Sequence, residues 1–233
     1  MNASDMLLVL LSGFLFSGIA ITGKPGAGDK TIYRETLIDS SSFASYAAFE
    51  AKWNYLYPWG SDHNGSARMI GGPGKHNHIA LMDSGVLHLK AEYIQHDEGR
   101  SNKDPFLPIK YHSGAIHAKH QVTVSDEWPM YEVSGYFKAP TSKGTWPAFW
   151  LTAVRGWPPE SDILEFKGDD TNWQNTFITP RQITTTKISV PDAATVWHHY
   201  KALLIRVNHT DIDIHYFIDD QLTGVHRANF MNQ

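Results

Sequence analysis

Gly144-Thr-Trp-Pro-Ala-Phe-Trp-Leu151 and Gly156-Trp-Pro-Pro-Glu-Ser-Asp-Ile-Leu-Glu165 carry the clearest structural signal in the chain. The second segment ends in an acidic stretch. If residues 160–165 form one strand, side chains alternate between faces, so Glu160 and Asp162 share a face that Glu165 does not. A β-bulge at Ile163-Leu164 returns Glu165 to the acidic face, and bulges are frequent beside active sites. The sequence therefore predicts a bulged strand with three carboxylates in a row.

Three neighbouring carboxylates have a chemical consequence. Like charges held close together cannot all ionise easily, so at least one pKa must rise. One carboxyl can then stay protonated while another is ionised, as glycoside hydrolysis requires, and a separation of about 5–5.5 Å indicates retention through a covalent intermediate. An exposed acidic strand, with or without a calcium ion among its oxygens, fits the same spacing.

Tryptophans upstream of the acidic stretch favour the catalytic interpretation. Trp146, Trp150 and Trp157 lie within the fourteen residues before Glu160. Flat aromatic rings commonly line small-molecule sites and match the apolar faces of sugars. Phe149, which lies among them, is expected in the core.

Elsewhere, apolar and polar residues alternate with a period of two, which is typical of half-buried strands. The clearest runs span residues 116–122, 131–137 and 212–218, and no 11-residue window after residue 20 carries a helical stripe. A chain of 233 residues with 42% hydrophobic and 19% charged residues can bury one globular core. We expect an all-β, two-sheet antiparallel jelly-roll sandwich.

Composition excludes several classes of function. The formal net charge of −4 argues against a nucleic-acid partner, because phosphate recognition needs a basic surface. The absence of cysteine excludes disulfides, thiolate zinc sites and thiol nucleophiles. His76 and His78 would share one face of a strand, but no third ligand accompanies them, so we expect no metal site and no cofactor.

The N-terminus has the features of a secretory signal. An eleven-residue apolar run, Met6 to Phe16, precedes small residues that suit cleavage after Ala20. The run is shorter than the about 20 residues of a membrane span. We expect a signal peptide over 1–20, a linker over 21–36, secretion, and no stable membrane association after cleavage. The sequons at Asn64 and Asn208 are candidate glycosylation sites.

The two tryptophan-rich segments resemble the signature of glycoside hydrolase family 16, the laminarinase, lichenase, agarase and carrageenase group. G-T-W-P-A-F-W-L followed by W-P-P-E-S-D-I-L-E is similar to its bulged, six-residue form. Weaker similarities extend the match over about Leu37 to Arg227. The resemblance implies a concanavalin A-like fold in a catalytic domain over 37–233. Because the family continues with further strands beyond the position of Gln233, it also implies a domain that lacks its C-terminal strands.

The resemblance also implies roles for the matching residues. Glu160 would be the nucleophile and Glu165 the general acid/base, while Asp162 would hydrogen-bond the nucleophile and tune both pKa values. Three tryptophans match positions that line the sugar subsites, namely Trp146, Trp150 and Trp157.

Two positions depart from the family pattern. Ser161 replaces an aliphatic residue, and because it should face away from the carboxylates we expect it to affect packing alone. The stretch Asn175-Thr-Phe-Ile-Thr179 lacks the histidine that many bulged members carry on the next strand.

These observations predict a secreted, monomeric, endo-acting retaining hydrolase whose partner is a β-linked polysaccharide. β-1,3-Glucan or mixed-linkage glucan is the first choice of substrate, with algal galactans also open. A transglycosylase, in which a sugar hydroxyl replaces water, would use the same site. A glycan-binding, lectin-like protein would keep the fold without catalysis. The intact row Glu160, Asp162 and Glu165 favours the enzyme, whereas the missing histidine favours the lectin.

Overall fold

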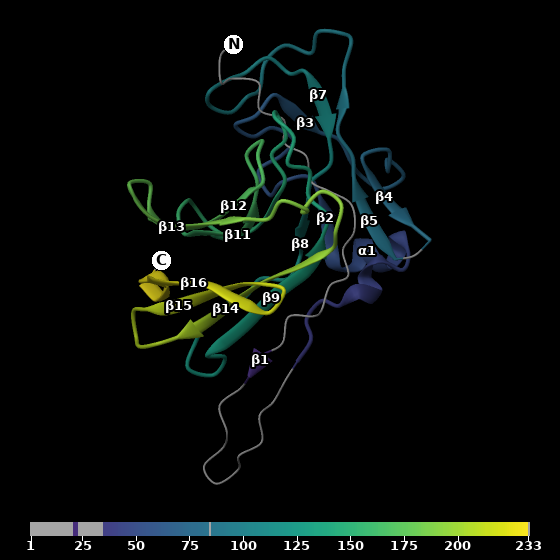
Figure 1. The fold of residues 1–233 in the computed structure, drawn as a ribbon. Helices are drawn as coiled ribbons and strands as arrows, with labels where there is room; N and C mark the ends of the chain where they lie inside the picture. Colours follow the sequence, from purple (N-terminus) through teal and green to yellow (C-terminus); the bar gives the residue numbers. More distant parts are fainter. Residues whose placement is uncertain (1–20, 23–34, 84, 233) are drawn as a thin grey trace.

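The structure is a computed structural model that describes residues 21–22, 35–83 and 85–232. Two antiparallel sheets stack face to face and form its main body (Figure 1). The antiparallel jelly-roll sandwich expected from the sequence is confirmed. The expected signal peptide over 1–20 lies outside the described residues, as does most of the expected linker over 21–36.

The five-stranded sheet and the four-stranded sheet form the two layers of the sandwich. In spatial order, the first consists of β1 (Ile21–Thr22), β9 (Met130–Phe137), β14 (His198–Arg206), β15 (Ile212–Ile218) and β16 (Gln221–Ala228). The second consists of β10 (Ala148–Thr152), β11 (Glu160–Glu165), β12 (Thr171–Thr179) and β13 (Gln182–Ser189).

Shorter strands flank the sandwich. They are β2 (Trp53–Tyr55) with β8 (Ile116–Ala118), β4 (Ile79–Met82) with β5 (Val86–Leu89), and β3 (Ala67–Met69) with β7 (Tyr111–Ser113) and β6 (Glu92–Tyr93). The pair β3–β7 is parallel. Two 3₁₀ helices span Ser40–Phe43 and Phe230–Asn232, and among the described residues there is one α-helix, α1 (Tyr46–Lys52).

Helix α1 explains why one expected strand is shorter than its sequence pattern. The Ser45 side chain caps the helix by accepting from the backbone N–H of Ala48 at 3.1 Å. The helix ends directly before β2, so the pairing of β2 with β8 stops at Trp53 and Ala118. The strand expected over 116–122 therefore ends at Ala118, although its apolar residues continue to alternate.

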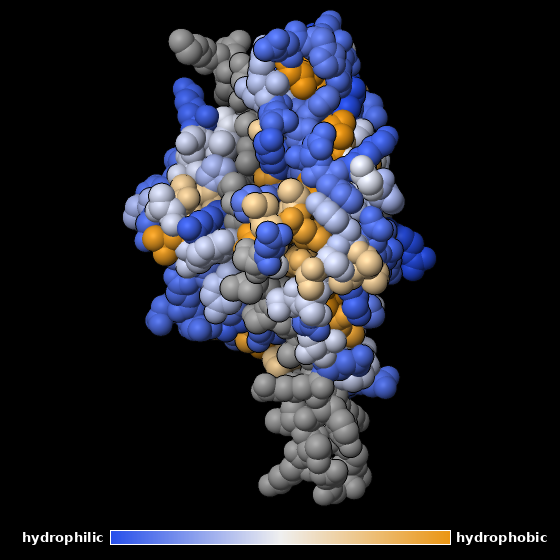
Figure 2. All heavy atoms as spheres, turned by 90° about the vertical axis from the view of Figure 1, so that its right-hand side faces the viewer, coloured by the Kyte–Doolittle hydropathy of each residue, from blue (hydrophilic) through white to orange (hydrophobic). Residues whose placement is uncertain are grey.

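The core lies between the two layers and continues under the flanking elements, where Met69, Ile79 and Leu87 are buried. On β15, Ile212, Ile214, Tyr216 and Ile218 are buried and alternate with partly exposed residues, as the period of two predicted. Each fully buried Ile or Leu side chain stabilises the fold by about 1.5–3 kcal/mol. The side of the molecule that carries β4, β5 and α1 is mostly hydrophilic, with small separate apolar groups (Figure 2), as expected when most apolar side chains are inside.

A buried tyrosine hydroxyl joins the two layers. Tyr216 donates to the backbone oxygen of Asn175 at 2.9 Å, and its hydroxyl also bonds Ser161 Oγ at 2.6 Å and Thr176 Oγ1 at 2.7 Å. These contacts tie β15 to both β11 and β12. Ser161 faces away from the carboxylates as expected, but the expectation of packing alone is wrong, because its hydroxyl is a partner of Tyr216.

His226 extends this hydrogen-bonded group. Its Nδ1 lies 2.9 Å from Thr176 Oγ1 and its Nε2 lies 2.9 Å from Thr186 Oγ1. Burial lowers the pKa of His226, so the neutral imidazole is favoured. With a proton on Nδ1, the ring donates to Thr176 and accepts from Thr186, and both nitrogens are satisfied.

We predict that Tyr216→Phe lowers the free energy of unfolding by about 1–3 kcal/mol, because the buried Asn175 carbonyl loses one donor and two hydroxyls lose a partner. Urea unfolding followed by tryptophan fluorescence measures this. Tyr93→Phe is the matched control, since Tyr93 is 64% exposed. Equal stability of the two variants would show that the hydroxyl does not tie the sheets together.

Candidate active site

Strand β11 carries the acidic row in the interior of the four-stranded sheet, between β10 and β12. Trp150 of β10 lies opposite Asp162, and Ala148 lies opposite Glu165. The register between them shifts, so that Ile163 has no partner in β10. The bulge predicted in this stretch is confirmed.

The bulge brings Asp162 and Glu165 to one face of the sheet. The side-chain nitrogen of Asn175 lies 2.8 Å from Asp162 Oδ2 and 2.8 Å from Glu165 Oε2. Ser161 points to the opposite face, where it reaches Tyr216. The row expected from the spacing is therefore present.

Burial and mutual repulsion control the ionisation of the row. Burial, with a smaller contribution from the Glu165 charge, raises the pKa of Glu160 to about 7, although the Trp157 hydrogen bond partly opposes the shift. Burial and the charges of both glutamates raise the pKa of Asp162 well above its usual range. The three groups therefore do not all ionise near neutral pH, and at least one proton is retained among them.

Glu165 is surrounded by hydrogen-bond donors. Trp146 Nε1 donates to its Oε1 at 2.6 Å, and Asn175 Nδ2 donates to its Oε2 at 2.8 Å. The Lys167 ammonium lies 3.1 Å from the same Oε2 and 5.2 Å from the centre of the Trp146 ring. Both oxygens are held in place, and the donors offset part of the cost of burying the carboxylate.

Glu160 has a more open environment at the other end of the row. Trp157 Nε1 donates to its Oε2 at 2.8 Å. The Trp157 ring is 49% exposed and lies 5.6 Å from the ring of Phe177 on β12. An exposed aromatic ring beside a carboxylate can contact a sugar and the reacting group together.

Trp150 belongs to a separate aromatic group on the β10 side of the row. Its ring lies 6.2 Å from the His63 ring and 5.9 Å from the Trp59 ring, which is 37% exposed. Burial, with the nearby Lys103 charge, lowers the pKa of His63 to about 4, so the ring is neutral at neutral pH. Phe149 packs against Phe137 in the core, as expected.

Three residues of the site were not identified as site residues from the sequence: His63, Lys167 and Asn175. His63 and Lys167 carry no motif. Asn175 lies in the stretch where the sequence lacks the family histidine, and its pairing opposite Asp162 depends on the register of β11 with β12. Alternation within β12 places Asn175 on a definite face but does not identify its partner.

The two candidate glycosylation sites are accessible. Asn64 and Asn208 are both exposed, and Asn208 lies between β14 and β15. Its Oδ1 accepts from the backbone N–H groups of Thr210 and Asp211, each at 2.8 Å. Glycosylation at either position stays a prediction.

The histidines at 76 and 78 do not form a strand pair. His76 precedes β4 and stacks on Tyr46 at 3.5 Å, while His78 Nδ1 lies 2.9 Å from the Lys90 carbonyl oxygen. No group of three or more His, Asp or Glu side chains within the described ranges could hold a metal ion. None of the helices in the described part of the chain has the length and apolar character of a membrane span.

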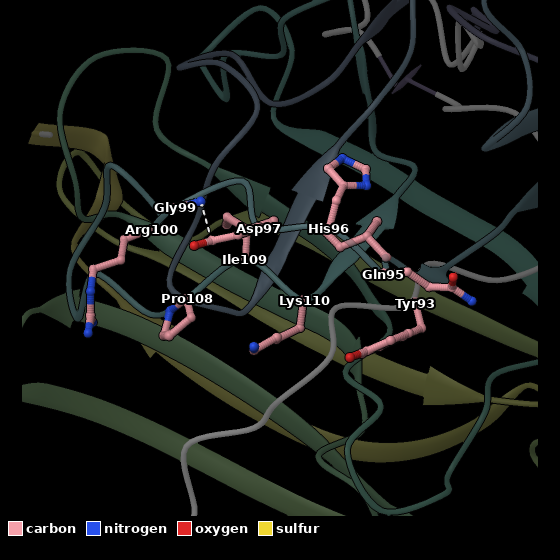
Figure 3. Close-up of a pocket in the computed structure, with 10 residues that line it drawn as sticks. Tyr93, Gln95, His96, Asp97, Gly99, Arg100, Pro108, Ile109 and Lys110 are labelled. Atoms are coloured by element: carbon pink, nitrogen blue, oxygen red, sulfur yellow. Dashed lines mark hydrogen bonds between the residues drawn. The ribbon is translucent and has the colours of Figure 1, made fainter.

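A cavity of about 460 Å³ lies away from the acidic row. Residues between Tyr93 and Lys110 line it, including His96, Asp97 and Arg100 (Figure 3). It contains none of the three carboxylates or three tryptophans named above, so the candidate active site is the face of the four-stranded sheet and not this cavity.

Comparison with known proteins and solved structures identifies relatives of this chain. A galactan endo-beta-1,3-galactanase of Flammulina velutipes is 41% identical over 209 residues, which make up 89% of this chain and 79% of that protein. The structure of a non-specific endo-beta-1,3(4)-glucanase from family GH16 matches with a TM-score of 0.56 at 16% identity, over 97% of this chain and 79% of that one.

Porphyranase B of Zobellia galactanivorans matches with a TM-score of 0.55 at 17% identity, over 77% of this chain and 69% of that one. A structure from a study of endo-acting O-glycanases of the human gut microbiota has a TM-score of 0.51 at 20% identity, and this chain spans 65% of its length. At these identities the structures support the fold alone.

Residues 94–231 match the family described as Glycosyl hydrolases family 16. Together with the galactanase relative, this match shows that the chain belongs to glycosyl hydrolase family 16, a family of endo-β-glycanases, and is a glycosidase that hydrolyses O-glycosyl bonds.

Proposed function

We propose that this protein is an endo-acting, retaining β-glycan hydrolase and that β-1,3-linked galactan is its substrate. The observation that carries the proposal is the bulged acidic row of β11, in which Glu160 and Glu165 have different environments. The 41% identical relative, a galactan endo-beta-1,3-galactanase, supports galactan over the glucans that the sequence alone favoured.

In this proposal the reaction is a double displacement. Glu165 protonates the leaving glycosidic oxygen while the Glu160 carboxylate attacks the anomeric carbon and forms a glycosyl-enzyme. Glu165, now ionised, takes a proton from water, and the resulting hydroxide releases the sugar and regenerates Glu160. Asp162 stays buried between the two glutamates, where its own ionisation depends on their charge.

The tryptophans would hold both the sugar and the carboxyl groups. Trp146 and Trp157 each donate an indole N–H to one reacting glutamate, so their rings would lie beside a sugar at the cleaved bond. Trp150, grouped with His63 and Trp59, would bind a sugar on the β10 side of the row.

The proposal includes export. The apolar run of Met6 to Phe16 and the small residues before position 21 support cleavage after Ala20. The catalytic domain would then span 37–233, after a linker over 21–36. The exposed asparagines Asn64 and Asn208 would be accessible to glycosylation in the secretory pathway.

We predict that the protein releases oligosaccharides from β-1,3-galactan and that Glu160→Ala lowers kcat by about a thousandfold or more, because the covalent step loses its nucleophile. Mass spectrometry of the products measures this, with laminarin, mixed-linkage glucan, agarose and carrageenan in parallel. Cleavage of a glucan but not of galactan would show that the substrate is a glucan. Binding without cleavage of any polymer by the folded protein would favour the lectin-like alternative.

Glu165→Ala should lose activity on polysaccharide but recover part of it with azide when the substrate carries an activated aryl leaving group. Such a leaving group needs no acid, and azide attacks the glycosyl-enzyme without a base. The expected product is the β-glycosyl azide, which NMR identifies. A burst of aryl alcohol would show that the first step is intact. If azide then fails to speed release of the sugar from the enzyme, Glu165 is not the acid/base.

The pH profile should reflect the raised pKa of Glu160. Below that pKa the nucleophile is protonated, so kcat/KM should fall as the pH is lowered through about 7 and not through the ordinary value of 4.5. On a substrate with an activated aryl leaving group, which needs no acid, Glu165→Gln should move this acidic limb to lower pH, because the Glu165 charge contributes to the raised pKa of Glu160. Asp83→Asn, an exposed carboxyl that follows β4, is the control. An unchanged limb in Glu165→Gln would contradict electrostatic coupling between the two glutamates.

A further inference from the structure

We propose that Asn175 and Thr185 are positioning residues that hold Asp162 and Glu165 in one fixed arrangement, an inference that rests on the proposed function. We refer to these four side chains as the amide clamp. The clamp crosses three neighbouring strands, β11, β12 and β13, in a single line of hydrogen bonds.

Strand register places the members of the clamp side by side. Asp162 lies opposite Asn175 in the pairing of β11 with β12, and Asn175 lies opposite Thr185 in the pairing of β12 with β13. Residues directly opposite on neighbouring strands share a face and are close enough for their side chains to bond. The bulge then adds Glu165 to this face.

Thr185 determines which way the Asn175 amide points. Its hydroxyl donates to Asn175 Oδ1 at 2.8 Å. A hydroxyl can donate to the amide oxygen, so this bond turns the NH₂ group toward the carboxylates, where only a donor is useful. Without the hydroxyl, the amide can rotate and present its oxygen to the acidic row.

The Asn175 NH₂ group has two hydrogens and two carboxylate partners. One nitrogen lies 2.8 Å from both Asp162 Oδ2 and Glu165 Oε2, so these oxygens are separated by no more than twice that distance. Asn175 is 3% exposed, and water therefore does not compete for the bonds. Because an amide does not titrate, the clamp keeps both donors at every pH, which an imidazole at this position would not.

The backbone of Asn175 is fixed as well. Its carbonyl oxygen accepts from the Tyr216 hydroxyl on the other sheet. Trp146 holds the second oxygen of Glu165. Glu165 thus has one oxygen bound to the indole and the other bound to the amide, and its carboxyl plane is defined from two sides.

The test uses Asn175→Ala, Thr185→Val and Thr185→Ser on an activated aryl β-galactoside and on β-1,3-galactan. Asn175→Ala should lower kcat by about 10²-fold with a small change in KM, because misplacement of a reacting group by about 1 Å has an effect of this size. Thr185→Val should lower kcat by about tenfold, the effect expected from the loss of one hydrogen bond to a buried side chain, and both variants should shift the pH profile. Thr185→Ser, which keeps the hydroxyl, should recover most of kcat and the original profile.

Thr184→Val is the matched control, because Thr184 is also exposed and neighbours Thr185 on the same strand but points to the other face. It should leave kcat and the pH profile unchanged. A Thr185→Val enzyme with the kcat and pH profile of the wild type would overturn the clamp.

A second readout separates the clamp from the proposed function. In ¹³C NMR titrations of the side-chain carboxyl groups, Asn175→Ala and Thr185→Val should change the titration of Asp162, to which Asn175 donates, and leave that of Glu98 unchanged. If the wild type cleaves no substrate, the proposed function fails, whereas an altered titration still supports the clamp. Unaltered titration of Asp162 in both variants would overturn the clamp whether or not the wild type is active.

Discussion

Repulsion among Glu160, Asp162 and Glu165 is the constraint on which the rest of the site depends. Three carboxyl groups share one face of one strand, and burial weakens the screening that water would provide. Their ionisation is therefore linked, and both Glu160 and Asp162 have raised pKa values. In a site of this kind at least one carboxyl stays protonated near neutral pH while another can ionise, and carboxyl groups in different ionisation states can serve acid/base and nucleophilic roles.

The sandwich stabilises this arrangement from the reverse side of β11. Leu164 and Ile163 are fully buried, and Ser161 bonds the Tyr216 hydroxyl of the opposite sheet. The same hydroxyl fixes the backbone of Asn175, which contacts the acidic row. Packing and hydrogen bonds in the core thus position a strand whose other face carries repelling charges. The hydrogen-bond donors around that face offset part of the free-energy cost of burying its carboxyl groups.

Much of the site could be predicted from local sequence. The spacing of Glu160, Asp162 and Glu165 was enough to predict the strand, because alternation is a local property, and the bulge followed from requiring Glu165 on the acidic face. Contacts that depend on register between strands could not be predicted in this way. The hydrogen bonds of Asn175 with the acidic row and with Thr185 are examples. His63 reaches Trp150 from a loop nearly ninety positions away in the chain, and no local pattern indicates that contact. The position at which β8 ends could not be predicted either, because it depends on where α1 ends and β2 begins.

The central claim is that Glu160 attacks the anomeric carbon while Glu165 acts as acid and base. The most direct test is to identify the residue labelled by an activated 2-fluoro glycoside of β-1,3-linked galactose. Such a substrate forms the covalent intermediate faster than water releases it, so the labelled protein accumulates. Proteolysis and mass spectrometry should locate the sugar on Glu160, and Glu160→Gln should remain unlabelled. A sugar attached to Glu165 or Asp162 would contradict the account.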